Sequence, residues 1–153
     1  MKTIQKPGDN LGGLLKIWAV PSDVVSVENG IATITSTTNV YQLYCTPESM
    51  EFTEPKEVTE AGIVYNTSIG GFIPGNQTDL QEALEYIEPR KWVVIFRDGN
   101  GNYLAAGASH YPLRAAGEIR SGRLTADASG CQLTFGGKTL ARAKSIANPF
   151  ITD

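Results

Sequence analysis

The stretch WVVIF at residues 92–96 is apolar at every position, and it constrains the fold more than any other feature. Successive side chains of a strand point to opposite faces, so such a strand must be covered on both sides. Residues 78–88, just before it, form an amphipathic helical pattern that Pro89 ends. Its apolar stripe consists of Leu80, Ala83, Leu84 and Ile87. The sequence therefore predicts a central strand with this helix on one face and a second layer on the other.

Most of the remaining chain has the pattern of short strands separated by turns. Strands are expected at residues 14–20, 31–35, 40–45, 111–119 and 131–135. Turns are expected at Asn29–Gly30, Ser121–Gly122 and Gly136–Gly137. With 153 residues the chain fits a single domain, residues 1–153. The predicted class is α+β, mainly antiparallel β, as a β-barrel or a two-layer β-sandwich with one packed α-helix at about 78–88.

An acidic segment at about residues 46–62 is predicted to be an extended arm or loop. Its glutamates recur every third residue, a spacing that alternates between the two faces of a strand: Glu48, Glu51, Glu54, Glu57 and Glu60. Pro55 excludes a continuous helix here. Two interpretations stay open: an arm or hairpin leading into a strand at 62–69, and a solvated loop.

The charges are unevenly distributed along the chain. Residues 1–88 carry four basic and twelve acidic side chains, for a net charge of −8, whereas residues 89–153 carry nine basic and four acidic ones, for +5. Two interpretations stay open. The two parts place their charges on different solvated faces of one domain, or an acidic edge of one copy meets a basic edge of the next.

The segment DGNG at residues 98–101 resembles the start of a calcium loop, but the rest of that motif is missing. An EF-hand needs glycine at its sixth position and glutamate at its twelfth, where this chain has Tyr103 and Ser109. Asn100–Gly101 instead predicts a tight hairpin in which both residues have positive φ. The segment FGGKT at 135–139 lacks the first glycine of a phosphate-binding loop, since Gln132 stands there. No cofactor is expected.

Candidate catalytic and metal-binding residues are few. His110 is the only histidine, and no nucleophile motif or metal-ligand spacing accompanies it. Cys45 and Cys131 lie far apart and are expected to be buried free thiols. Basic residues of the C-terminal part lack interleaved aromatics, so specific nucleic-acid binding is not expected. No apolar run is long enough for a membrane span or a signal peptide, so we expect synthesis in the cytoplasm and no membrane contact.

Three segments together resemble a family of small structural proteins encoded by phages and prophages of Bacteroides-type bacteria. They are LGGLLKIWAVPSDV at 11–24, PRKWVVIFRDGNGNYLAAGASHYPLRAAGEIRSG at 89–122 and CQLTFGGKTLARA at 131–143. The shared layout is a strand, a DGNG turn, a strand of small residues, YPLR and SG. The segment from Glu48 to Gly75 lies outside the resemblance.

This resemblance implies a non-enzymatic virion component, similar to tail-tube or tail-completion proteins of the tail or neck. Such a subunit would form homo-oligomers, for example hexameric rings, and would contact other phage structural proteins. It would reside in the bacterial cytoplasm during assembly and in the virion of an active phage. We expect the acidic arm of one copy to dock on basic residues of a neighbour. The expected subunit interface consists of Glu51, Glu54, Glu57, Glu60, Arg120, Arg123, Lys138, Arg142 and Lys144.

Two other classes of function stay open. A small-molecule or carbohydrate-binding β module would stack its ligand on exposed aromatics, and the candidates are Trp18, Tyr41, Tyr44, Trp92 and Tyr103. A hydrolase-like enzyme would use Asp98 and His110, provided that the hairpin following Asp98 brings the two side chains together.

Overall fold

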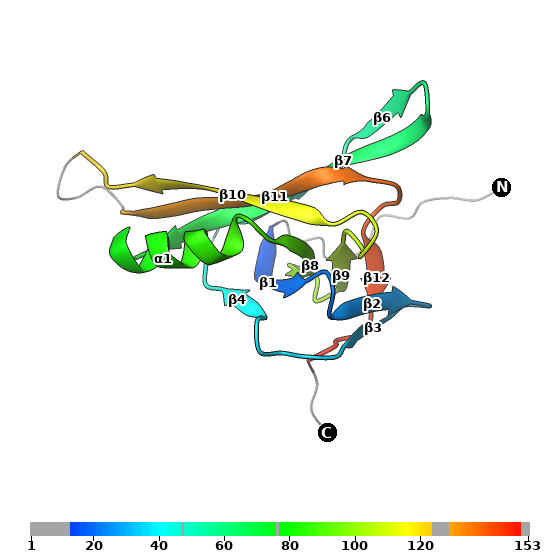
Figure 1. Ribbon diagram of the computed structural model, residues 1–153, viewed down its shortest axis with the longest axis horizontal. Coiled ribbons are helices and arrows are strands. Elements are labelled where there is room, and N and C mark those ends of the chain that lie inside the picture. The colour runs from blue at the N-terminus through cyan, green and yellow to red at the C-terminus, as the bar shows by residue number, and fades with distance from the viewer. Residues whose placement is uncertain (1–12, 47, 76, 124–128, 151–153) are drawn as a thin grey trace.

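Figure 1 shows the computed structural model, which describes residues 13–46, 48–75, 77–123 and 129–150. The first strands are β1 (Leu14–Pro21), β2 (Val25–Glu28), β3 (Ile31–Ile34), β4 (Tyr41–Leu43), β5 (Glu51–Thr53), β6 (Lys56–Thr59) and β7 (Gly62–Pro74). The helix α1 (Gln77–Ile87) follows. The last strands are β8 (Lys91–Asp98), β9 (Tyr103–Ala106), β10 (Leu113–Arg120), β11 (Gly130–Thr139) and β12 (Lys144–Ile146).

The strands form one large antiparallel sheet and one small one. The large sheet has ten strands, and β2 pairs with β3 in the small sheet. The predicted class, α+β with mainly antiparallel strands and one helix, is therefore confirmed. No closed barrel is detected in the described part of the chain, so the barrel alternative finds no support.

The large sheet bends at one end of β8. This strand pairs with β1 along one edge, and with β9 along the other through residues 94–97. Only its first two residues, Lys91 and Trp92, pair with β10. The sheet thus divides into a first half, β4–β1–β8–β9–β12, and a second half, β10–β11–β7, with β5 and β6 on the outer edge of β7. Figure 1 shows the two halves as separate layers, with α1 beside the second.

The central strand is covered on both faces, as its sequence requires. Trp92, Val94 and Phe96 point into the core that lies between the two halves and includes residues of α1. Val93 and Ile95 point into a second core, to which β2 and β3 contribute. All five side chains are at most 2% exposed. Layers on both faces were predicted, and the small β2–β3 sheet covers one of them, but the second half of the large sheet covers the other together with α1, not the helix alone.

The acidic segment contains a hairpin. β6 pairs with the N-terminal part of β7 from Lys56↔Tyr65 to Thr59↔Gly62, and β5 pairs with the same strand further along. β7 is thirteen residues long, so its first residues extend beyond the body of the sheet together with β6 (Figure 1). Of the two interpretations of residues 46–62, the hairpin into a strand is the one observed.

Two predicted turns were wrong in detail. Gly136 and Gly137 lie inside β11, where they pair with Ser68 and Thr67 of β7, so pairing with a neighbouring strand outweighed the local turn signal. At the β8–β9 hairpin only Gly101 has positive φ, and Asp98 pairs with Asn102 around a three-residue loop. The Asn29–Gly30 turn is confirmed, with φ of 52° and 75° at its two central residues.

Candidate interaction surfaces

The hairpin and the end of β11 form ion pairs within one chain. Glu57 lies 3.6 Å from Lys138 and accepts a 2.9 Å hydrogen bond from the Asn66 amide. This hydrogen bond and then the charge of Lys138 lower the pKa of Glu57 below its ordinary value. Register explains the meeting, because Lys138 pairs with Asn66 across the β7–β11 ladder and Glu57 pairs with Val64, two residues from Asn66 on the same face of β7.

A second ion pair fastens the other face of the hairpin. Arg142 Nη1 lies 3.4 Å from Glu54 Oε1, and its guanidinium lies 4.6 Å from the centre of the Tyr65 ring. The second oxygen of Glu54 accepts a 2.9 Å hydrogen bond from the Ala143 N–H. Glu54 is thus held by both the main chain and a side chain of the segment after β11.

The expected interface residues are therefore only partly available to a neighbour. Glu54, Glu57, Lys138 and Arg142 pair with one another in the same chain, and Arg120 forms an exposed pair with Glu118 at 3.3 Å. Within the described residues, Glu51, Glu60 and Lys144 form no ion pair. Arg123 follows β10, beyond Gly122. Opposite charges of the two sequence halves thus meet within one chain, and docking of the arm on a neighbour stays a prediction.

The outer part of the hairpin exposes a pair of apolar side chains. Val58 and Ile63 lie opposite each other across β6 and β7 and are 72% and 50% exposed. Directly paired residues point to the same face of a hairpin, so the two side chains form one apolar spot. An exposed apolar spot on a projecting element is a feature of contact surfaces.

The second half of the large sheet has two edges without a paired strand in the described residues: β6 on one side and, on the other, the part of β10 beyond Arg114, where Leu84 of α1 packs close to Gly117. The Asn66 N–H donates to the Pro55 carbonyl at 2.9 Å, so by alternation the main-chain groups of Lys56 and Val58 point away from β7. On the other side, the Gly75 N–H donates to the Ser129 carbonyl at 3.3 Å, which fixes the residues of β11 that bond to β7. The alternate residues of β11 bond to β10, and by the same alternation the main-chain groups of Gly117 and Ile119 point away from β11.

The β8–β9 hairpin does not bring Asp98 and His110 together. Asp98 Oδ1 accepts hydrogen bonds from the N–H groups of Asn100 and Asn102, both at 2.9 Å, so this carboxylate organises the turn. His110 follows the opposite end of β9 and packs edge-on against Tyr111. The four residues of β9 separate the two by roughly 10 Å or more. No group of three or more His, Cys, Asp and Glu side chains in the described residues could hold a metal ion.

The aromatic residues proposed for ligand stacking mostly belong to the cores. Trp92 is fully buried, and Trp18 is 8% exposed and stacks on Tyr103 and Phe150. Tyr44, at 75% exposed, lies with Tyr41 beside an apolar crevice of about 320 Å³ between β4 and α1. Both cysteines are free thiols, as predicted; Cys131 is buried and Cys45 is partly exposed.

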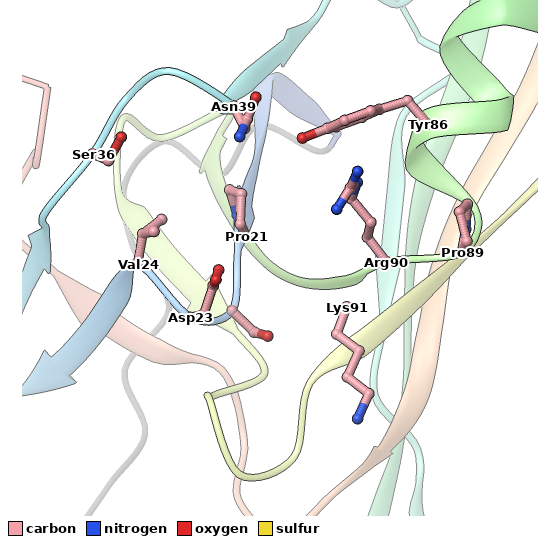
Figure 2. A pocket seen from close by; sticks show the side chains of 10 residues that line it. Pro21, Asp23, Val24, Ser36, Asn39, Tyr86, Pro89, Arg90 and Lys91 are labelled. Carbon is pink, nitrogen blue, oxygen red and sulfur yellow. The ribbon is translucent and has the colours of Figure 1, made fainter.

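A polar pocket of about 380 Å³ lies where the β1–β2 turn meets the end of α1 and the start of β8. Figure 2 shows the side chains of Asn39, Tyr86 and Arg90 pointing toward one another, with Asp23 on the opposite wall and Lys91 pointing away. The Arg90 guanidinium lies 4.0 Å from the centre of the Tyr86 ring. Burial and then the neighbouring Tyr86 raise the pKa of Tyr41 above its ordinary value. The nearby positive charge of Arg90 partly offsets this rise.

The sequence did not indicate this pocket. Its residues come from three separate segments, near Asp23, near Asn39 and near Arg90, which only the fold brings together. One local signal was available: Arg90 follows Tyr86 closely, just past the end of the predicted helix, and a cation near an aromatic ring can stack on it.

No family model, curated protein or solved structure was found to match this chain. The helix in the described part of the chain is neither long nor apolar enough to cross a membrane.

Proposed function

We propose that the protein is a non-enzymatic structural subunit that assembles with copies of itself, head to tail, through the β6 and β10 edges. The observation that carries the proposal is the presence of two open edges on opposite sides of one half-sheet. An open edge presents unpaired N–H and C=O groups to which a strand of another chain can pair. Because the two edges differ, their contact is heterologous and leads to a ring or a stack.

Two further features support the β6 side as a contact element. Val58 and Ile63 are exposed on a hairpin that projects from the sheet, and a neighbour would remove them from water. Glu51 and Glu60 add negative charge without an ion pair on this side, whereas Arg114 of β10 is exposed and forms no ion pair within the described residues. These charges favour β6 meeting β10 over either edge meeting itself.

The resemblance to phage and prophage proteins gives this assembly a biological setting. In the proposal, the subunit belongs to the tail or neck of a virion, with a hexameric ring as the expected form. It is made in the bacterial cytoplasm and contacts other structural proteins of the phage.

Proline substitutions at outward-facing N–H groups test the proposal without breaking the internal ladder. Val58→Pro removes an N–H of β6 that β7 does not use. Ile119→Pro removes an N–H of β10 that β11 does not use. Light scattering across protein concentration should show oligomers for the wild type and monomers for each variant. Val58→Thr and Ile119→Val retain the N–H groups and serve as matched controls.

Mixing the two proline variants distinguishes the kind of contact. Val58→Pro retains a working β10 edge and Ile119→Pro retains a working β6 edge, so an equal mixture should form dimers and nothing larger. Formation of no complex in the mixture would contradict a head-to-tail contact. A wild type that remains monomeric at all concentrations, at both low and high salt, would contradict self-assembly.

A further inference from the structure

The guanidinium of Arg90 is held in place but is not neutralised. It lies over the Tyr86 ring, and neither a hydrogen bond nor an ion pair joins it to another side chain within the described residues. A guanidinium presents five N–H donors in a rigid planar arrangement that matches the two oxygens of a carboxylate. Arg90 is therefore oriented to bind an anionic group in the pocket in front of it.

The opposite wall of the pocket carries the complementary charge. Asp23 lies in the turn between β1 and β2, and it forms no ion pair with Arg90 or Lys91 within 4.0 Å. Figure 2 shows the Asp23 carboxylate on the far side of the pocket from the Arg90 guanidinium. A cation and an anion that face one space without contacting each other suit a ligand with one charge of each sign.

We propose that this pocket binds a small zwitterion of the α-amino-acid type, with its carboxylate on Arg90 and its ammonium group on Asp23. A cavity of about 380 Å³ has room for a molecule of amino-acid or dipeptide size. Ser22, Ser36 and Asn39 add polar groups to the lining, while Pro21, Val24 and Pro89 provide apolar surface for an aliphatic side chain. This inference is independent of the proposed assembly.

The surroundings disfavour a purely anionic ligand such as phosphate. Asp23 repels a dianion, and α1 ends at Ile87, so the negative end of its dipole lies on this side. The Ile87 carbonyl is already occupied, since it accepts hydrogen bonds from the Trp92 indole at 2.8 Å and from the Arg90 N–H at 3.3 Å. Lys91 also borders the pocket, but its ammonium group points away in Figure 2, so Arg90 and Asp23 are the charged groups that face the ligand, one of each sign.

Titrations followed by ¹⁵N–¹H NMR test the proposal directly on this 16.5 kDa protein. The probes are glycine, glutamate, arginine and phenylalanine, together with the N-acetyl and methyl-ester forms of each and with inorganic phosphate. At least one free amino acid should give saturable shifts at Ser36, Asn39 and Arg90, with Kd of about 1 mM or lower. Its N-acetyl and ester forms, which each lack one charge, should bind at least about tenfold more weakly.

Matched variants assign each charge to its residue. Arg90→Gln should weaken the free amino acid and its N-acetyl form by about tenfold or more, because both present a carboxylate. Asp23→Asn should weaken the free amino acid but leave the N-acetyl form unchanged or bound more tightly. Lys56→Gln is the control, since Lys56 lies on β6 and is not among the residues that line the pocket, and it should change Kd by less than about twofold.

Three results would overturn the inference. The first is the absence of saturable shifts with every amino acid up to about 50 mM, a concentration far above the expected Kd. The second is binding that Arg90→Gln leaves unchanged, which would place the ligand elsewhere. The third is inorganic phosphate binding as tightly as the amino acids, which would make the pocket a simple anion site.

Discussion

At the scale of single residues, the glycines of the second half-sheet differ sharply in what surrounds them. A methyl group on Gly70 would lie 2.3 Å from the Leu133 carbonyl oxygen and 2.9 Å from Thr134 Cα, both of them main-chain atoms. A methyl group on Gly136, in β11 of the same sheet, would meet nothing closer than the Thr67 carbonyl oxygen at 3.5 Å. Close approach of two strands, rather than turn formation, thus requires glycine at position 70.

We expect Gly70→Ala to destabilise the protein by about 2–3 kcal/mol, because the main chain of β11 must shift. Gly136→Ala should stay within about 0.5 kcal/mol of the wild type, since the new methyl group finds ordinary contacts. Chemical denaturation measures both free energies of unfolding. Equal losses for the two variants would contradict the difference in packing.

The thiol of Cys45 gives a prediction about reactivity. Burial raises its pKa from the ordinary value of 9.0 to about 11. At pH 8 the thiolate fraction is then about one in a thousand, roughly a hundredfold below that of an unperturbed thiol. Alkylation by iodoacetamide, followed by peptide mass spectrometry, should be slower by about this factor than in denaturant. The rate should rise about tenfold per pH unit up to pH 10. Equal rates in the native and denatured protein would contradict the burial argument.

At the scale of elements, a buried pair of hydroxyl groups joins β7 to the end of β11. Thr67 and Thr139 are 3% and 1% exposed, and their Oγ1 atoms lie 2.9 Å apart. Thr139 also lies within hydrogen-bonding distance of the Ala141 carbonyl, at 3.0 Å, so the Thr67 hydroxyl donates to Thr139 when Thr139 donates to Ala141. This chain of bonds fixes the end of β11 just before the segment that carries Arg142.

Removing one hydroxyl of this pair should lower the free energy of unfolding by more than half of what removing both hydroxyls does. Thr139→Val leaves the buried Thr67 hydroxyl without its partner, and we expect a loss of about 1–2 kcal/mol. The double variant Thr67→Val with Thr139→Val should lose less than the sum of the single losses, with a coupling of at least about 0.5 kcal/mol. Strictly additive losses in thermal or chemical unfolding would show that the two hydroxyl groups act independently.

At the scale of the whole molecule, the long strand β7 brings the oppositely charged parts of the chain together. Its partners are β5 and β6, which belong to the acidic segment, on one edge and the end of β11 with Lys138 on the other. Glu57 therefore meets Lys138, and Glu54 meets Arg142, across more than eighty residues of sequence. The opposite net charges of residues 1–88 and 89–153, −8 and +5, are therefore partly matched to each other within the chain. The apolar spot and the outward main-chain groups that support assembly are not used by these ion pairs, although Glu57 belongs to β6.

The sequence by itself determined the class of fold and the place of its central strand. The all-apolar WVVIF segment and the amphipathic helix before it carry periodicities that depend only on local geometry, and both elements formed where they were predicted. The Asn29–Gly30 turn followed for the same reason, since positive φ is a local requirement. Strand ends differed more: β7 and β11 continue to Pro74 and Thr139, beyond the predicted ends at 69 and 135, because pairing with neighbours sets them.

Only the tertiary structure decided which distant groups meet. Gly136–Gly137 became part of β11 because β7 is long enough to pair with it, and no local signal encodes the length of a partner. The separation of Asp98 from His110, the ion pairs of the hairpin and the pocket around Arg90 each depend on strand register. Register is set by which apolar faces are buried together, a property of the packed molecule and not of any one segment.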